Sequence, residues 1–301
     1  MKLFYSDHFE IPLPDGHRFP IDKYALLRRR LEAGGLNAEV TLCEPEPVSE
    51  ADLLRVHTRD YVTRVLEGRL TERELRRIGF PWSPGLVERS LRSVGGTVAA
   101  AFAAQKAGLA GNLAGGTHHA YAGHGEGFCV FNDVAVAARK LQAQGAARRV
   151  LIIDADVHQG NGTASIFTAD ETVFTFSIHG AKNFPFHKES GDLDIALADN
   201  AGDDAFLQAL QRGLETSLAR AKADLVFYIA GADPFQGDRL GRLALSKAGL
   251  ARRDEMVLDF CRRKSLPVAI VLGGGYAKDI ADTVDIHFRT FQIAAMYWKD
   301  L

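Results

Sequence analysis

The segment from residue 150 to residue 163 joins an apolar strand to ionisable side chains. It reads Val-Leu-Ile-Ile-Asp-Ala-Asp-Val-His-Gln-Gly-Asn-Gly-Thr, and its four leading apolar residues predict a strand that is buried on both faces. Side chains alternate along an extended segment, so Asp154, Asp156 and His158 share one side of it. Because an unpaired charge in a protein interior is strongly unfavourable, we expect a bound cation to compensate these groups.

The composition and charge of the chain narrow the classes of function. Of the 301 residues, 47% are hydrophobic, which is enough for a large core. The net charge of −2 gives no electrostatic footprint for nucleic acid or for an anionic membrane surface. Cys43, Cys129 and Cys261 are too scattered for a disulfide framework, and no apolar run reaches the length of a membrane span. We therefore expect a cytoplasmic protein that binds neither nucleic acid directly nor a membrane.

Strand-like and helix-like patterns alternate along the chain. The predicted strands are Lys2–Tyr5, Ala38–Leu42, Asn112–Ala114, Arg149–Ile153, Thr172–Ser177, Leu225–Ile229 and Val268–Leu272. The predicted helices are Lys23–Ala33, Ser49–Arg55, Asp60–Leu66, Pro84–Ala107, Asn132–Gln144, Gly162–Phe167, Asp203–Lys222, Ser246–Lys264 and Asp279–Trp298. This alternation predicts an α/β fold with one mainly parallel sheet and helices on both faces. No linker, repeat or low-complexity segment divides the sequence, so we expect residues 1–301 to form a single domain.

Five of the predicted strands run directly into polar or glycine-rich sequence. The segments at their ends are residues 115–119, 154–158, 177–179, 231–233 and 273–276. In open parallel sheets, ligands bind outside the carboxyl ends of the strands. One such segment could arise by chance, but five together predict an active site at this edge of the sheet.

Asp156, His158 and Asp233 are the predicted metal ligands. They offer two carboxylate oxygens and one imidazole nitrogen. Three protein ligands leave a coordination position open, as in catalytic zinc sites. Because two of the three donors are hard oxygen ligands, Fe2+ or Mn2+ is an alternative to Zn2+. In the competing interpretation, the aspartates only cap a helix and a loop.

The adjacent histidines His118 and His119 need a backbone kink if both are to face the site. Neighbouring side chains on an extended segment point in opposite directions, and the pair Gly115–Gly116 supplies the necessary freedom. A histidine beside a metal-activated water is a suitable general base, because its pKa lies near neutrality. Each ring needs a partner that fixes its tautomer, and Asp154 and Asn161 are candidates. Alternatively, one ring packs in the core and the other is solvated.

Tyr276 follows three glycines after the last predicted strand. Its phenol, with an ordinary pKa of about 10, stays protonated and can donate a hydrogen bond to a developing oxyanion. Phe128 and Phe184 are candidates for the walls of an aliphatic tunnel, although either could belong to the core. The glycine-rich segment 123–128 is not a phosphate loop, because it lacks the Lys-Ser/Thr ending.

These segments resemble those of a known family. In chain order they are Gly115–Ala120, Gly127–Asp133, Asp154–Gly162, Ala230–Asp233 and Gly273–Tyr276. Together they resemble the histone deacetylase and acetylpolyamine amidohydrolase superfamily, which has an arginase/deacetylase-like α/β fold. Residues 237–241 and 79–83 are most similar to the class IV histone deacetylases and their bacterial homologues.

The resemblance implies two bound metal ions. The implied zinc ligands are Asp156, His158 and Asp233. The implied ligands of a structural potassium ion, partly through backbone oxygens, are Asp154, Asp156, His158, Ser177 and Ile178.

The resemblance also implies roles in catalysis and substrate binding. His119 would act as general base and then as general acid, beside His118, which Asp154 holds. Tyr276 would polarise the substrate carbonyl. The implied substrate contacts are the backbone carbonyl of Gly127, which accepts the amide N–H, and the tunnel walls Phe128 and Phe184.

Asn161 is a departure from many members of the family. They carry an aspartate at this position, where it orients the catalytic histidine. A neutral partner leaves His119 less basic, so we expect a different pH dependence in this chain.

The leading hypothesis is a zinc-dependent deacylase that hydrolyses the amide of N-acyl-lysine, acetyl or longer, or of a related N-acylated amine. The main alternative is an acetylpolyamine or other small-molecule amidohydrolase, although no long insertion or acidic gate marks a polyamine specialist. A binuclear-manganese ureohydrolase is disfavoured, because Phe235 stands where such enzymes carry a second aspartate. A non-catalytic acyl-binding protein is a further alternative. The sequence leaves acyl-chain length, native metal and oligomeric state open.

Overall fold

The computed structural model describes residues 1–34, 36 and 40–298. Within these ranges, one eight-stranded sheet has the order β2-β1-β3-β8-β7-β4-β5-β6, and its neighbouring strands are parallel. The strands are β1 (Lys2–Phe4), β2 (Thr41–Cys43), β3 (Leu109–Asn112), β4 (Val150–Asp154), β5 (Val173–Gly180), β6 (Leu193–Leu197), β7 (Leu225–Ile229) and β8 (Val268–Val271). The prediction of an α/β fold with a parallel sheet is confirmed.

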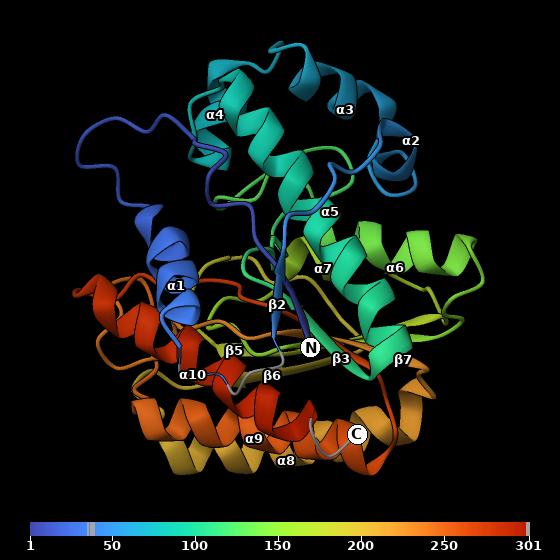
Figure 1. Cartoon of the computed structure of the whole chain (residues 1–301), viewed down its shortest axis with the longest axis vertical. Helices are drawn as coiled ribbons and strands as arrows, with labels where there is room; N and C mark the ends of the chain where they lie inside the picture. Colours follow the sequence, from blue (N-terminus) through green and yellow to red (C-terminus); the bar gives the residue numbers. More distant parts are fainter. Residues whose placement is uncertain (35, 37–39, 299–301) are drawn as a thin grey trace.

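Helices cover both faces of the sheet, so the chain forms three layers (Figure 1). The helices on one face are α1 (Asp22–Glu32), α8 (Asp203–Ala221), α9 (Lys247–Arg263) and α10 (Ile280–Trp298). Those on the other face are α5 (Pro84–Ala107), α6 (Asp133–Ala143) and α7 (Asn161–Ile166). Tyr228 of β7 joins the first core and its neighbour Phe227 joins the second. Both residues are fully buried, as expected for a strand with an apolar layer on each side.

Three short helices lie beyond the N-terminal part of α5 and enclose a third apolar cluster (Figure 1). They are α2 (Glu50–Leu53), α3 (Arg59–Leu66) and α4 (Glu72–Ile78). Helix α4 begins with a capping box, in which Thr71 and Glu74 each bond the backbone N–H of the other. It ends at Gly79, whose φ of 88° lies in the left-handed region. The sequence analysis does not include α4, because its mostly charged residues give a weak apolar pattern.

Strand β7 has its predicted bounds, and β1, β4, β5 and β8 differ from theirs by one to three residues at an end. Strands β2, β3 and β6 need separate explanations. Strand β3 covers Leu109–Asn112 and not Asn112–Ala114. It contains Gly111, where a Cβ would lie 2.6 Å from the ring of Phe291, so close packing of α10 places a poor strand former here. Strand β6 was not predicted, because its edge position leaves alternate residues exposed and gives no continuous apolar run. Strand β2 begins at Thr41, whereas residues 38–39 of the predicted strand Ala38–Leu42 lie outside the described residues.

The strand order brings the five polar segments to one edge of the sheet. They follow β3, β4, β5, β7 and β8, and these strands are consecutive in space as β3-β8-β7-β4-β5. Because the strands are parallel, their carboxyl ends share one edge. The site is therefore assembled from chain segments that are up to about half the sequence apart.

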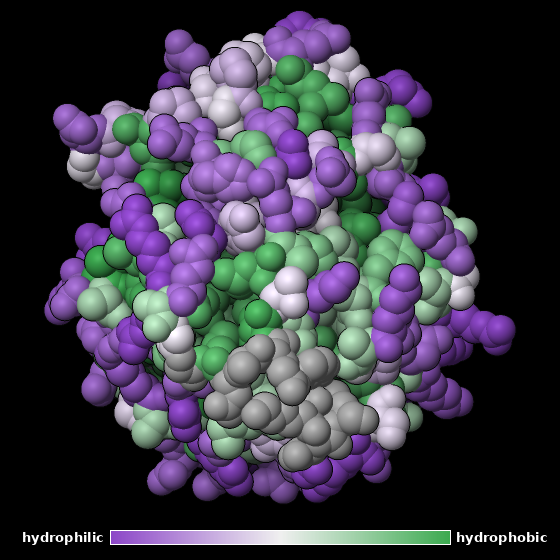
Figure 2. Space-filling model, in the orientation of Figure 1, coloured by the Kyte–Doolittle hydropathy of each residue, from purple (hydrophilic) through white to green (hydrophobic). Residues whose placement is uncertain are grey.

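The face of the molecule in Figure 2 is mostly hydrophilic along the helices below the sheet, and hydrophilic and hydrophobic residues are mixed over the α2–α4 region. Hydrophobic residues gather across its middle, over the sheet edge where Figure 1 labels β2. Within the described part of the chain, no helix is both long and apolar enough to cross a membrane.

Gly213 of α8 tests how closely the helices pack on the sheet. A Cβ added to Gly213 would lie 2.1 Å from Cζ of Phe176, a core residue of β5. We expect Gly213→Ala to lower the free energy of unfolding by about 1–3 kcal/mol, because overpacking outweighs the better helix propensity of alanine. Urea denaturation measures this change. Gly123→Ala is the control, because nothing lies within 4 Å of its added Cβ. Unchanged stability of Gly213→Ala would contradict the tight packing.

Candidate metal centre and substrate cleft

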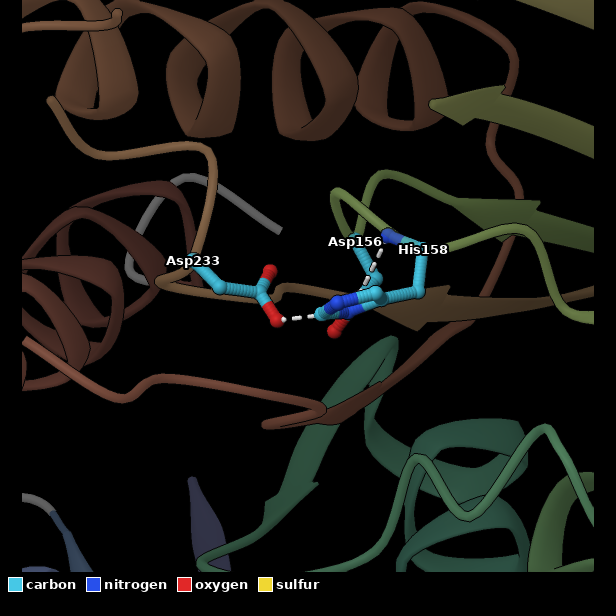
Figure 3. A group of neighbouring side chains, drawn as sticks. All are labelled: Asp156, His158 and Asp233. Atoms are coloured by element: carbon cyan, nitrogen blue, oxygen red, sulfur yellow. Dashed lines mark hydrogen bonds and ion pairs between the residues drawn. The ribbon is translucent and has the colours of Figure 1, made fainter. Parts of the chain in front are cut away.

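Asp156, His158 and Asp233 lie together beyond the carboxyl ends of β4 and β7. Their ligand atoms fall within 4.8 Å of one another, and all three residues are buried. Nδ1 of His158 is 3.0 Å from Oδ1 of Asp156 and 3.1 Å from Oδ2 of Asp233 (Figure 3). Two carboxylates and an imidazole that converge on one point are suited to a divalent cation. The structure therefore brings together the three predicted metal ligands.

Backbone N–H groups hold the two carboxylates of this group. Val157 N donates to Oδ1 of Asp233 at 3.0 Å, and Gly274 N donates to Oδ2 of Asp156 at 2.6 Å. A Cβ at Gly274 would lie 1.9 Å from Oδ2 of Asp233. Glycine is thus required for the turn after β8 to approach the metal ligands.

Arg253 of α9 connects the loops that carry Asp156, His158 and Asp233. Its Nη1 donates to the carbonyls of Ala155, in the β4 loop, and Gly231, in the β7 loop. The Arg253 side chain is fully buried and forms an ion pair with Asp254, in which Nη2 and Oδ1 are 2.8 Å apart. A buried guanidinium that spans two backbone carbonyls fixes the distance between the loops.

Burial and crowding shift the pKa values of the metal-ligand group. Burial, with the neighbouring carboxylate of Asp156, raises the pKa of Asp233 to about 7. Burial lowers the pKa of His158, but its hydrogen bonds to Asp156 and Asp233 outweigh burial and raise this pKa to about 10. The His158 proton lies between two carboxylates, so binding of a cation to the same atoms would displace it.

The kink predicted before the paired histidines is present. Gly115 and Gly116 have φ values of 79° and 73°, and the ring centroids of His118 and His119 are 4.2 Å apart. Nδ1 of His118 is 2.6 Å from Oδ2 of Asp154. Both histidines are buried, and Asp154 lies where the sequence analysis expects a partner for one ring.

The two histidines have opposite electrostatic environments. Burial lowers the pKa of His118, but the carboxylates of Asp154 and Asp156 outweigh burial and raise it to about 9. Burial lowers the pKa of His119 well below its ordinary value, and positive charge on His118 and His158 lowers it further. Neighbouring groups whose pKa values are pushed apart are suited to separate acid–base roles. His118 retains its proton, whereas His119 is free to accept one.

Asn161 fixes the tautomer of His119. Its Oδ1 is 2.7 Å from Nδ1 of His119, and its Nδ2 donates to Oε1 of Glu126 and to the hydroxyl of Tyr121, each at 3.1 Å. A carboxylate only accepts hydrogen bonds, so the Asn161 amide nitrogen faces Glu126 and its oxygen faces His119. Nδ1 of His119 therefore carries the hydrogen, and Nε2 is left to accept a proton. Nε of Arg77 donates to Oε2 of Glu126 at 2.5 Å and holds this carboxylate.

Asp238 and Lys23 hold Tyr276 in place. The backbone N–H of Tyr276 donates to Oδ2 of Asp238 at 2.6 Å, and Nζ of Lys23 lies 5.3 Å from the centroid of the phenol ring. Nζ of Lys23 also donates to the carbonyl of Gly275 at 3.4 Å. Burial, with the nearby carboxylate of Asp233, raises the pKa of Tyr276 well above its ordinary value. The phenol therefore stays protonated as a hydrogen-bond donor.

A cleft of about 640 Å³ leads from the surface to these residues. Its lining includes the buried side chains of His119, His158 and Tyr276 and the half-buried rings of Phe128 and Phe184. The ring of Phe184 packs edge-on against His119, with centroids 4.9 Å apart, and Phe128 lies 5.9 Å from Tyr276. The two predicted wall residues thus line the cleft, and Phe128 also packs against the apolar cluster enclosed by the short helices.

The segment that carries Gly127 and Phe128 is fixed by the end of α4. Gly127 N donates to the carbonyl of Arg77 at 3.1 Å, and Phe128 N donates to that of Ile78 at 2.7 Å. Phe128 has a φ of 65°, in the left-handed region that is unfavourable for side chains of its size. A Cβ at Gly79 would lie 2.8 Å from the Phe128 ring. The unpredicted helix α4 therefore positions one wall of the cleft.

Ser177 and Ile178 lie in β5, beside the end of β4. Ser177 is the register partner of Asp154, and its Oγ is 2.9 Å from Nδ1 of His179. Ile178 is fully buried. The structure thus places Ser177 next to one of the other residues that the resemblance implies for potassium.

Several residues that support the site were not predicted from the sequence. They are Lys23, Tyr121, Glu126, Asp238 and Arg253. Each contacts a predicted site residue, or the loop that carries it, from another part of the chain. Such single contacts leave no spacing pattern in a sequence. Asp238 and Glu126 gave one available signal, because each is an acidic residue within a glycine-rich segment.

Comparison with known proteins identifies the family. The model of the histone deacetylase domain matches residues 17–291, which is most of the chain. The chain belongs to the histone deacetylase family. It is 31% identical to histone deacetylase 2 of Arabidopsis thaliana, over 95% of this chain and 78% of that protein. It is 31% identical to a histone deacetylase-like amidohydrolase of Pseudomonas aeruginosa, over 89% of this chain and 74% of that protein.

Two further comparisons agree with this assignment. An uncharacterized protein of Picosynechococcus sp. is 50% identical over 95% of each chain. The crystal structure of the HDA15 HD domain is similar with a TM-score of 0.81 and 22% identity, over 98% of this chain and 90% of that one. The predicted arginase/deacetylase-like fold is therefore confirmed, as is the resemblance to histone deacetylases.

A divalent cation is expected to stabilise this histone deacetylase family member through Asp156, His158 and Asp233. Zn2+ at about 100 times its Kd should raise the free energy of unfolding by about 2.7 kcal/mol. Asp233→Asn removes one ligand charge and should abolish most of this gain. Urea denaturation of the chelator-treated protein, with and without Zn2+, measures both effects. Asp60→Asn is the control, because the Asp60 side chain is 77% exposed on α3. Equal gains in wild type and Asp233→Asn would place the ion elsewhere.

Asn161→Asp is expected to have two separable effects. A carboxylate at this position faces the carboxylate of Glu126, so the free energy of unfolding should fall by about 1–3 kcal/mol. The added negative charge stabilises the imidazolium form of His119, so the pKa of His119 should rise. Urea denaturation and a histidine titration by NMR in the metal-free protein measure these changes. Adding Glu126→Gln to the Asn161→Asp variant removes the repulsion between the two carboxylates. This double variant should regain its stability, while the pKa of His119 should remain raised. An unchanged His119 pKa would contradict the contact with Asn161.

Proposed function

We propose that the chain is a zinc-dependent deacylase that hydrolyses the amide of N-acyl-lysine, acetyl or longer, or of a related N-acylated amine. Family membership and the amidohydrolase relative support amide hydrolysis as the reaction. The observation that carries the proposal is the pair of differently held histidines beside a group that could bind a metal ion. His118 bonds the carboxylate of Asp154 and His119 bonds the neutral amide of Asn161, at the buried end of an aromatic cleft.

Asp156, His158 and Asp233 would hold the zinc ion. When bound, the ion would act as a Lewis acid that polarises the substrate carbonyl and makes water more acidic. Fe2+ and Mn2+ are alternatives, because two of the three donors are carboxylates. A structural potassium ion at Asp154, Asp156, His158, Ser177 and Ile178 is part of the proposal, and the register pairing of Asp154 with Ser177 supports it.

His119 would move the proton in the first half of the reaction. Its Nε2 is unprotonated, because Asn161 holds the hydrogen on Nδ1. This atom would take a proton from the attacking water as the carbonyl carbon becomes tetrahedral. The protonated ring of His118 and the hydroxyl of Tyr276 would stabilise the negative charge that develops in the site.

Departure of the amine needs the same proton. His119 would return it to the amide nitrogen as the carbon–nitrogen bond breaks, which yields a carboxylic acid and a free amine, and proton transfer between these products then gives the carboxylate and the ammonium ion. The backbone carbonyl of Gly127 would accept the substrate amide N–H, and Phe128 and Phe184 would flank the aliphatic chain. Their rings line the cleft and exclude water from the methylene groups of a lysine side chain.

The alternatives have less support from the described residues. A second metal ion next to Asp233 would need another carboxylate, but Phe235 packs in the hydrophobic core. An acyl-binding protein without turnover would have no need of an oriented histidine and a buried phenol. An acetylpolyamine hydrolase would use the same catalytic residues. The charges at the mouth of the cleft distinguish this alternative from the hydrolysis of an acyl-lysine peptide.

Tyr276→Phe tests the proposed reaction. Loss of one donor to the developing oxyanion should lower kcat by about 10²–10³-fold, with a smaller change in KM. Steady-state hydrolysis of acetyl-lysine and long-chain acyl-lysine peptides by the zinc-loaded protein measures it. Tyr5→Phe is the control, because Tyr5 lies in the N-terminal segment and does not line the cleft. Wild-type turnover by Tyr276→Phe would exclude the role of the phenol, and no hydrolysis by the wild-type protein would refute the deacylase.

A further inference from the structure

Positive charges surround the mouth of the cleft. The lining residues with a charged side chain include five cations, here called the basic rim: Arg18, Arg77, Lys182, Arg239 and Arg242. All five are exposed. They come from the segment before α1, from α4, and from the loops after β5 and β7. The chain has a net charge of −2, so the basic rim is a local concentration and not a general property of the surface.

Acidic neighbours neutralise only part of the basic rim. Arg77 pairs with Glu126, and Arg242 pairs with Asp199 at 3.1 Å. Nζ of Lys182 is 3.9 Å from the same Asp199 carboxylate. Two carboxylates thus pair with three of the five cations.

Arg18 and Arg239 keep their full charge. Neither forms an ion pair with a carboxylate of the described residues. The guanidinium of Arg18 lies 5.2 Å from the centroid of Phe128, and Nε of Arg239 donates to the carbonyl of Tyr276. Both cations therefore contact residues that line the cleft.

An exposed aromatic side chain accompanies the basic rim. Phe186 is 83% exposed and lines the same cleft. Its ring centroid is 6.3 Å from that of Phe184, which packs on His119. Its ring therefore offers a large apolar contact area to a polypeptide that is bound at the mouth of the cleft.

We propose that the substrate is an acyl-lysine within an acidic polypeptide segment, an inference that rests on the proposed deacylase function. The reacting amide lies inside the cleft, so the basic rim and Phe186 contact whatever carries the amine. Acetylated polyamines keep protonated amines, which the basic rim repels. Carboxylates on either side of the lysine are attracted. The cations come from four chain segments around the mouth, so several carboxylates are needed to pair with them. A polypeptide can carry several carboxylates at this spacing, whereas a small molecule carries one.

The first experiment compares substrates that differ only in charge. Three acetyl-lysine peptides carry glutamate, glutamine or lysine on both sides, and N-acetylspermidine and free Nε-acetyl-lysine complete the set. We expect kcat/KM for the acidic peptide to exceed that for the basic peptide by about 10-fold at low salt. Screening should bring this ratio towards one in 0.5 M NaCl, where the Debye length is well below its value of about 8 Å at 0.15 M. Acetylspermidine should be the poorest substrate.

Equal rates on the three peptides, or faster hydrolysis of acetylspermidine, would overturn the proposal. So would free Nε-acetyl-lysine hydrolysed as efficiently as the acidic peptide. Hydrolysis of the glutamine peptide tests the deacylase activity separately. Affinities of the same peptides, labelled and measured by fluorescence anisotropy, test the basic rim without turnover. Failure of one proposal is therefore distinguishable from failure of the other.

Variants of the basic rim provide the second experiment. Arg18→Gln and Arg242→Gln should each lower the acidic-to-basic ratio by about 2–5-fold, and Arg18→Lys should keep it, because the charge remains. Arg212→Gln on α8 removes the same charge away from the cleft and is the matched control. Phe186→Ser should raise KM for the peptides more than for free Nε-acetyl-lysine. A ratio unaffected by Arg18→Gln and Arg242→Gln, or changed equally by Arg212→Gln, would overturn the role of the basic rim.

Discussion

Buried negative charge at one edge of the sheet is the constraint on which the rest of the site depends. Asp154, Asp156 and Asp233 are at most 3% exposed. The chain surrounds them with positively polarised groups: the His118 ring, the N–H groups of nearby backbone and the site for a cation. Glycines after β8 are needed because any side chain there would hold these groups away. The arrangement leaves one histidine, His119, without a carboxylate and therefore able to accept a proton.

The sequence was sufficient to predict which residues gather at the candidate site, but not those that position them. The predicted metal ligands and the paired histidines follow buried strands, so a local pattern reveals them. Glu126 and Arg253 act through single contacts with distant segments, and such contacts have no periodicity. The same limit applies to secondary structure. The edge strand β6 and the charged helix α4 bury too little apolar surface to give a clear pattern, although α4 shapes the cleft through Gly79.

The neutral side chain of Asn161, where the family resemblance implies an aspartate, is best understood together with its surroundings. The negative charge is not lost from this part of the site, because Glu126 lies on the far side of the amide and is held by Arg77. The Glu126 carboxylate lies one side chain further from His119 than a carboxylate at position 161 would. The Asn161 amide orients the hydrogen bond to Nδ1 of His119 without placing a full negative charge beside the ring. The tautomer and the basicity of His119 are therefore set by different residues. Comparison of position 161 alone would not reveal that different residues set these two properties.

Strand β8 has a consequence for how the protein is made. It is the last strand along the chain, yet it lies in the middle of the sheet, between β3 and β7. Without it, the remaining strands form two separate ladders, β2-β1-β3 and β7-β4-β5-β6. His118 follows the first ladder, and Asp156, His158 and Asp233 follow strands of the second. The chain is synthesised from its N-terminus, so both ladders are made before the strand that joins them. The two halves of the candidate site therefore come together late, when β8 inserts between β3 and β7.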